Sequence, residues 1–263
     1  MTDFIATNRN HWNAVTPGHV TSDFYDVESF KAGRDTIDPV EADLVGEVSG
    51  RTLLHLQCHF GLDTMSWTRR GAIATGIDFS EVAIATAASL AANLNLNSRF
   101  KVGNVLNADL GEQFDIVFTS HGVLGWLPEL RAWGETVARH LKPGGKFVLV
   151  DSHPVLWAFD DERDDGEMRL RYDYFSREVL TFEEAGSYAN PDGPVTRILE
   201  RIHPTEDVLG ALINAGLTIT GFREYDHVAW QALPHMDQDE DGWWRLPAGT
   251  PRVPLMFSVT ATH

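Results

Sequence analysis

Polar residues that could bind a small molecule stand at the ends of successive apolar runs in this sequence of 263 residues. The segment Gln57–Gly61 follows the first run and leads into a helical pattern, and Asp78 follows the second run. Asn104 follows the third run and Ser120 follows the fourth. A carboxylate in the position of Asp78 can accept hydrogen bonds from both hydroxyl groups of a ribose. The spacing therefore predicts a site for a ligand that contains adenosine.

Two histidines in similar positions are candidate catalytic bases. His121 follows the fourth apolar run and His153 follows the fifth. Histidine titrates near neutral pH, so it can accept a proton from a hydroxyl group that is being modified. A structural role is the alternative for each of them. The single cysteine, Cys58, cannot form an intrachain disulfide, and no ligand spacing in the sequence supports a metal site.

The elements that must position these residues alternate between strands and helices. Short apolar runs predict strands at 51–56, 72–77, 100–102, 114–119 and 146–151, and helical spacing predicts helices at 62–70, 80–94 and 127–141. Near-continuous apolar strands are typical of a parallel sheet that is covered on both faces. Ligands bind at the carboxyl ends of the strands in such a doubly wound α/β fold. The candidate residues should therefore meet at one edge of the sheet.

Residues 154–203 interrupt this alternation. They combine an acidic stretch with alternating aromatic segments around 170–175 and 195–202, which predicts an inserted loop and antiparallel strands. The α/β pattern then resumes with a helix capped by Thr205 and with two strands at 217–225 and 254–260. A second segment that does not fit the α/β pattern lies between those two strands.

Charge and composition restrict the partners of this protein. The net charge is −17, and such a chain repels nucleic acids and anionic membranes, because affinity for polyphosphate comes mostly from Lys and Arg. The first residues do not have the pattern of a signal peptide, and no apolar run is long enough to span a membrane. We therefore expect a cytoplasmic protein that acts on a small molecule. The sequence leaves the oligomeric state open.

The order of these motifs resembles that of the class I S-adenosylmethionine-dependent methyltransferases. In that family an acidic residue and a glycine-rich loop end the first strand, an acid ends the second, and a Gly-Asp-Ala-like turn ends the third. Phe-Asp introduces the fourth strand, and a later helix ends in Leu-Lys-Pro-Gly-Gly. The matching segments here are His55–Gly61, Asp78, Gly103–Val105, Phe114-Asp115 and Leu141–Gly145. The resemblance covers about residues 45–152 and most of the C-terminal part.

This resemblance implies a Rossmann-like methyltransferase fold with a mostly parallel, seven-stranded sheet, helices on both faces, an antiparallel last strand and a β-rich insertion. Four positions depart from the family pattern. His55 replaces the first acid, Gln57 and His59 replace the first two glycines, and Asn104 replaces the aspartate of the third turn. Side chains in the loop obstruct a pyrophosphate, which argues against NAD or NADP as the cofactor.

The cofactor that the resemblance implies is S-adenosyl-L-methionine. It implies the ribose on Asp78, the adenine beside Phe79, and Asn104 with Val105 at the adenine edge. It places the methionine portion against Gln57, His59 and Gly61, with Ser120 nearby. Simpler roles compete with these assignments: Asp78 as a helix cap, Phe79 as a core residue and Asn104 as a turn residue.

The sequence thus predicts an S-adenosylmethionine-dependent methyltransferase that acts on a small molecule, with oxygen, nitrogen and carbon all open as the methylated atom. Residues 1–45 would form a lid or cap, and residues 46–263 the methyltransferase domain with its insertion at 154–203. The alternatives are a non-catalytic sensor or interaction module that binds an adenosyl ligand, and an NAD-linked dehydrogenase. The acceptor pocket is predicted from aromatic residues, namely Trp12, Tyr25, Trp126 and Tyr172.

Overall fold

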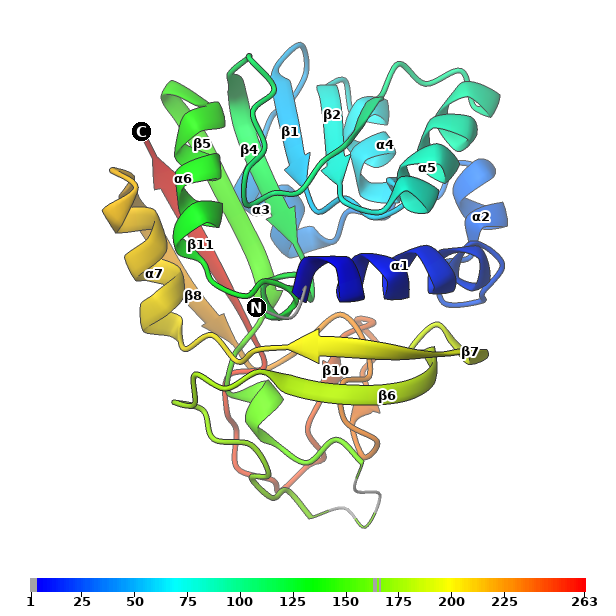
Figure 1. The fold of residues 1–263 in the computed structure, drawn as a ribbon, viewed down its shortest axis with the longest axis vertical. Coiled ribbons are helices and arrows are strands. Elements are labelled where there is room, and N and C mark those ends of the chain that lie inside the picture. The colour runs from blue at the N-terminus through cyan, green and yellow to red at the C-terminus, as the bar shows by residue number, and fades with distance from the viewer. Residues whose placement is uncertain (1–3, 163–164, 166) are drawn as a thin grey trace.

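The computed structural model describes residues 4–162, 165 and 167–263, and its centre is a seven-stranded sheet (Figure 1). The strands, in the order in which they lie side by side, are β3 (Arg99–Val102), β2 (Ile73–Asp78), β1 (Thr52–Leu56), β4 (Phe114–Ser120), β5 (Leu141–Ser152), β11 (Met256–Thr262) and β8 (Thr218–Tyr225). Strand β11 is antiparallel to both of its neighbours, and all other pairs in this sheet are parallel. The predicted doubly wound fold is confirmed.

Helices cover both faces of the sheet because the buried strands alternate their apolar side chains between two cores. On one face Leu54 and Phe147 pack with residues of α6 (Arg131–His140) and α7 (Thr205–Asn214). On the other face Leu53 and Phe118 pack with Trp67 and with the segment around α3. The helices near this second face are α3 (Pro39–Val45) and α4 (Leu62–Arg69), and α5 (Glu81–Asn93) packs against α4.

The N-terminal helix α1 (Phe4–Val20) lies between the main sheet and a β-hairpin (Figure 1). The hairpin consists of β6 (Leu180–Ser187) and β7 (Asn190–Glu200). Asn8 holds α1 to the hairpin, since its amide both donates to the Leu199 carbonyl at 2.7 Å and accepts from the Leu199 N–H at 2.9 Å. Asn13 holds α1 to the core by accepting from the Ser80 hydroxyl at 2.7 Å. Helix α1 therefore connects the insertion to the Rossmann-like core.

The helices of the predicted unit 1–45 pack at two places on the core. Helices α1 and α2 (Val27–Lys31) lie near the carboxyl edge of the sheet, where α2 packs against α4 and α5. In contrast, α3 packs on a face of the sheet, where its last residue, Val45, belongs to the same core as Leu53 and Phe118. A lid function of the first residues stays a prediction.

Several predicted boundaries were wrong, each for a local reason. The segment 170–175 is not a strand: it makes one isolated antiparallel bridge, between Leu170 and Phe159, and the partner of β7 is β6. Residue Thr205 is the first residue of α7 and Pro204 occupies the N-cap position without a side-chain bond. The helix predicted from 127 begins at Arg131, after the 3₁₀ turn η1 (Leu124–Trp126).

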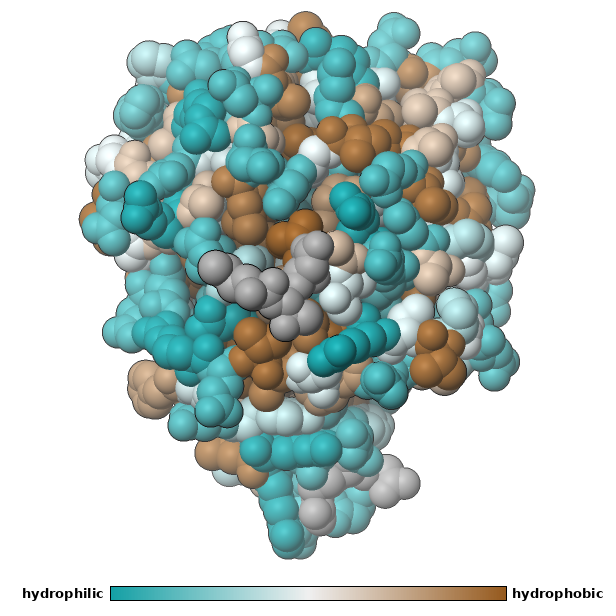
Figure 2. Space-filling model, viewed as in Figure 1, coloured by the Kyte–Doolittle hydropathy of each residue, from teal (hydrophilic) through white to brown (hydrophobic). Residues whose placement is uncertain are grey.

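The remaining elements are a second 3₁₀ turn, η2 (Leu156–Ala158), and the short pair β9 (Asp237–Gln238) and β10 (Trp244–Arg245). In the described part of the chain, no helix combines the length and apolarity needed to cross a bilayer. On the face drawn in Figure 2, hydrophilic residues predominate and apolar residues are scattered among them. Scattered apolar residues are ordinary for a protein surface and mark no interface.

Candidate active site

The carboxyl ends of the central strands open into a cavity of about 860 Å³. This volume lies in the upper part of the usual range for ligand pockets, so the cavity has room for a cofactor and a small second molecule. The strand order reverses at β1 and β4, which is where ligands bind in doubly wound sheets. The cavity brings together thirteen of the predicted site residues, namely Trp12, Tyr25, Gln57, His59, Gly61, Asp78, Phe79, Asn104, Val105, Ser120, His121, Trp126 and Tyr172.

The loop after β1 follows the backbone path of a glycine-rich loop although it has lost two glycines. The φ angles of Gln57, His59 and Gly61 are 55°, 50° and 81°. A left-handed conformation costs about 1–2 kcal/mol for a residue other than glycine. The methyltransferase family that this sequence resembles has glycine at these three positions. Gln57 and His59 therefore add side chains to the loop at backbone angles that glycine adopts readily.

The added side chains tie the loop to neighbouring elements. Gln57 donates from Nε2 to the Val123 carbonyl at 3.0 Å. The imidazole of His59 lies 2.9 Å from that of His19, Nε2 to Nδ1, and its ring contacts that of Trp12 with centroids 5.0 Å apart. Burial lowers the pKa of His19 to about 4 and that of His59 well below its usual value. Both histidines are therefore neutral at physiological pH and join α1 to the loop.

A pair of substitutions at Gln57 separates the backbone of this loop from its side chain. We expect Gln57→Gly to change the free energy of unfolding by less than about 1 kcal/mol, because relief of the left-handed strain offsets the lost bond to Val123. We expect Gln57→Val to lower it by about 2 kcal/mol, because a β-branched residue tolerates positive φ poorly. Denaturant unfolding measures both, and equal losses for the two variants would contradict this account.

Asp78 joins the loops that follow β1 and β2. Its Oδ2 accepts a hydrogen bond from the His59 N–H and its Oδ1 from the Ser80 N–H, each at 2.9 Å. Ser80 caps α5 as predicted, since its hydroxyl accepts from the Ala83 N–H at 3.0 Å. Burial raises the pKa of Asp78 to about 6. A carboxylate has about four acceptor positions, so two remain on Asp78 for the hydroxyl groups of a ligand.

The part of the cavity beside Asp78 is lined by apolar residues and one amide. Phe79 and Val105 line it, and the Asn104 side chain closes a turn by accepting from the Leu106 N–H at 3.0 Å. The turn role considered for Asn104 is therefore present, and it leaves the amide nitrogen of that side chain available to donate. An apolar slot with a single donor suits the edge of a purine ring.

His121 belongs to an ion-pair cluster with two acids of α3. Its Nε2 lies 2.9 Å from Asp38 Oδ2 and 3.4 Å from Glu41 Oε1. Burial alone would lower the pKa of His121, but the hydrogen bond to Asp38 and the charge of Glu41 raise this pKa to about 9. His121 is thus protonated at neutral pH with its Nε2 already engaged. A base needs an unprotonated nitrogen that is free to accept, and the catalytic role of His121 stays a prediction.

The same cluster has the donor types of a metal site. The ligand atoms of Asp38, Glu41 and His121 all lie within 4.8 Å of one another. Carboxylates with an imidazole are common ligands of divalent ions. In this structure the imidazolium itself compensates the carboxylate charge.

His153 lies outside the lining of the cavity, and its predicted role in catalysis stays a prediction. Its Nε2 lies 3.2 Å from Glu224 Oε1, and its Nδ1 accepts from the Val155 N–H at 3.1 Å. Both chain neighbours, Ser152 and Pro154, line the cavity. Successive side chains along an extended segment point to opposite sides, and His153 faces away from the site.

Asp151 is a residue of the cavity wall that the sequence analysis did not single out. Its carboxylate accepts hydrogen bonds from the backbone N–H groups of Gly122, Val123, Leu124 and Ser152, and it is 3% exposed. This carboxylate therefore fixes the loop after β4 against the end of β5. The sequence does contain a signal for this residue, because Asp151 is the acid that ends the apolar run 146–151.

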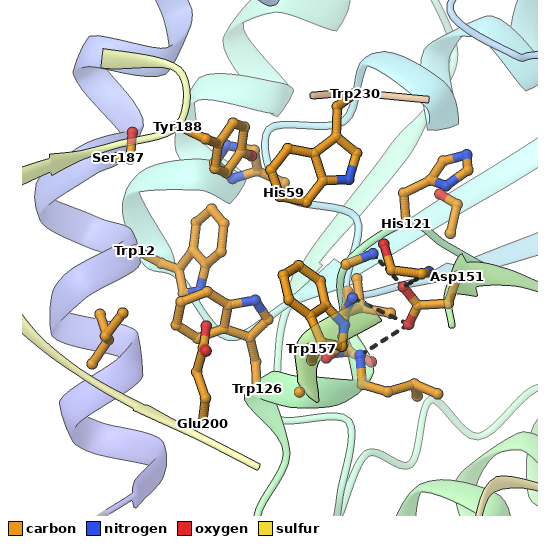
Figure 3. A pocket seen from close by; sticks show the side chains of 18 of the residues that line it. Trp12, His59, His121, Trp126, Asp151, Trp157, Ser187, Tyr188, Glu200 and Trp230 are labelled. Atoms are coloured by element: carbon orange, nitrogen blue, oxygen red, sulfur yellow. Dashed lines mark hydrogen bonds between the residues drawn. The ribbon is translucent and has the colours of Figure 1, made fainter. Parts of the chain in front are cut away.

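The other end of the cavity is an aromatic compartment. Trp12 packs against Trp126 with ring centroids 5.1 Å apart, and Trp157 packs against Trp230 at 5.8 Å. Tyr188 contacts Trp230 at 5.9 Å. Figure 3 shows these rings around the cavity, with Asp151 and its hydrogen bonds at the side nearer the sheet. Trp12 and Trp126 were predicted from the sequence, whereas Trp157, Tyr188 and Trp230 were not.

The comparisons with known proteins agree with this geometry. Residues 53–145 match the family model of a methyltransferase domain. The ubiquinone biosynthesis O-methyltransferase of Pseudomonas fluorescens (strain Pf0-1) is 30% identical over 144 residues, which are 52% of this chain and 61% of that protein. The match therefore spans less than two thirds of that curated relative.

Solved structures share the fold over most of the chain. An S-adenosylmethionine-dependent methyltransferase from Mesorhizobium loti has a TM-score of 0.61 at 22% identity and covers 86% of this chain and 96% of its own. The glycopeptide N-methyltransferase MtfA, complexed with S-adenosyl-L-methionine, has a TM-score of 0.54 at 20% identity. The match covers 84% of this chain and 90% of MtfA. The matched residues and the shared strand order therefore support a methyltransferase domain over residues 53–145, on a Rossmann-like fold that spans most of the chain.

Proposed function

We propose that this protein transfers the methyl group of S-adenosyl-L-methionine to a small molecule that binds in the aromatic compartment. The observation that carries the proposal is the continuity of one cavity. This cavity is lined both by Asp78 and by the rings of the aromatic compartment. An enzyme that transfers a group directly from one ligand to another needs both ligands in one continuous space. The family model and the curated relative are methyltransferases, which supports the same reaction type.

The residues present fit the cofactor. Asp78 keeps two acceptor positions for the ribose hydroxyl groups, and Phe79, Asn104 and Val105 border the space for the adenine. The backbone at Gln57 and His59 is left-handed, as a loop built for glycine allows. The methionine portion would then lie along Gln57–Gly61, with its sulfonium directed toward the aromatic compartment.

The chemistry supplied by the bound cofactor is a methyl group on a sulfonium, which an acceptor attacks in line. The protein's part is mainly to hold the two molecules at a reactive distance of about 3–3.5 Å and to exclude water. Helix α1 contributes through Trp12 and through the His19–His59 contact, which close the cavity beside the loop. His121 and His153 stay predicted bases, the first beside Asp38 and the second beside Glu224.

Calorimetric titration with S-adenosyl-L-methionine, S-adenosylhomocysteine and NAD tests the cofactor assignment. We expect micromolar binding of both sulfur ligands, corresponding to about −8 kcal/mol, and no binding of NAD. Binding of NAD alone would overturn the proposal. Tight binding of the sulfur ligands without consumption of S-adenosylmethionine in a screen of acceptors would instead favour a non-catalytic sensor.

A further inference from the structure

The β6–β7 hairpin turns one face toward the cavity, and that face carries two acids. Its alternate residues Leu180, Phe182, Glu184, Ile198 and Glu200 all line the cavity. This is the period of two expected when one side of a hairpin faces a space. In Figure 3 the side chain of Glu200 points from β7 toward the aromatic rings. The compartment therefore combines aromatic walls with carboxylates.

The two carboxylates have no cationic partner among the described residues. No ion pair or hydrogen bond of the described chain involves the side chain of Glu184 or Glu200. Two described arginines line the cavity, and both are engaged elsewhere: Arg201 donates to the Pro128 carbonyl at 2.5 Å and Arg34 to the Tyr25 carbonyl at 2.5 Å. Burial and the neighbouring charge of Glu184 raise the pKa of Glu200 to about 7. A cation in the compartment would relieve this unfavourable charge.

Aromatic rings are the other groups that bind organic cations. A cation over an indole or phenol ring is attracted by the negative face of the ring, most strongly for Trp. Trp126, Trp157, Trp230 and Tyr188 offer such rings around the space that Glu200 enters. An anionic acceptor would meet repulsion from both carboxylates, and a neutral one would leave the half-buried carboxylate of Glu200 unpaired.

We propose that the methyl acceptor is a protonated amine, which the indole rings enclose and which Glu200 pairs with. This inference rests on the proposed function and names its substrate class. Glu200 accepts one proton from the ammonium group, and the neutral amine then attacks the methyl carbon. The new nitrogen–carbon bond forms as the carbon–sulfur bond breaks, and the bonding pair stays on sulfur. The products are a methylated ammonium ion and S-adenosylhomocysteine, and the proton on Glu200 leaves to solvent.

Three probes of similar size and different charge test the substrate class. Benzylamine, benzyl alcohol and benzoate are titrated calorimetrically at neutral pH into protein saturated with S-adenosylhomocysteine. We expect benzylamine to bind about tenfold more tightly than benzyl alcohol, and benzoate not to bind. Benzylamine with S-adenosylmethionine should also give N-methylbenzylamine, detected by mass spectrometry. Preference for the alcohol or benzoate, or no benzylamine binding at millimolar concentrations, would overturn the inference.

Glu200→Gln, an isosteric change, tests the carboxylate. We expect this variant to lose the preference for benzylamine over benzyl alcohol, with the affinity for benzyl alcohol unchanged. Glu183→Gln is the matched control, because Glu183 is the neighbour of Glu184 on β6 and does not line the cavity. An unchanged preference in Glu200→Gln would contradict the role of this residue. If S-adenosylhomocysteine itself does not bind, the proposed function fails, whereas failure of benzylamine alone affects only the substrate class.

Discussion

Replacing Asp78 with alanine is expected to weaken the binding of S-adenosyl-L-methionine about a hundredfold, or about 2.7 kcal/mol. The change removes two hydrogen bonds from a charged acceptor to the ribose, each worth about 1.5–3 kcal/mol. It also leaves the His59 N–H without its partner, so the loop after β1 loses its tie to β2. Calorimetric titration of the purified variant measures the loss.

Two further variants make this result interpretable. Asp115→Ala is the matched control, because Asp115 bonds Thr52 and Lys142 at the opposite end of β4 and does not line the cavity. Asp78→Asn keeps the shape of the side chain and removes its titration. Since burial raises the pKa of Asp78 to about 6, cofactor affinity of the wild type should decrease as the pH falls through that value, and the decrease should be smaller in Asp78→Asn. Equal affinities of Asp78→Ala and wild type would refute the ribose assignment.

Asp151→Ala is expected to lower the free energy of unfolding by about 3 kcal/mol. The carboxylate of Asp151 accepts from four backbone N–H groups in the loop after β4 and at the end of β5, and alanine leaves these donors buried without partners. A chain of this size loses about 2–4 °C in melting temperature per kcal/mol, so we expect a decrease of about 6–12 °C. Calorimetry or circular dichroism measures this temperature.

The loop that Asp151 holds also carries Trp126 of the cavity, so cofactor-dependent turnover should decrease with stability. Asp109→Ala is the control, because Asp109 is exposed and accepts from only one backbone N–H, that of Gly111. Asp151→Asn should lie between the wild type and Asp151→Ala, since one acceptor oxygen remains. A melting temperature of Asp151→Ala equal to that of the control would show that these bonds contribute little.

The sequence was sufficient for the arrangement of the core. The apolar runs and helical spacing place the strands to within a few residues, and the polar segments after them converge on the cavity, as Gln57–Gly61 and Asp78 do. This information is local, because a strand or helix is encoded by the period of its own residues. The convergence then follows from the parallel sheet, whose strands all end at one edge.

The roles of single side chains in the site were decided by tertiary structure. His121 is a protonated partner of Asp38, which is 83 residues away in the sequence, and no local pattern encodes that contact. Gln57 and His59 replace glycines in the sequence, yet only their φ angles show that the loop keeps its path. Glu200 faces the aromatic rings because the hairpin register and α1 turn one face of β7 toward the cavity. Period and residue type fix local structure, whereas charge state and contact depend on which distant residues share a buried space.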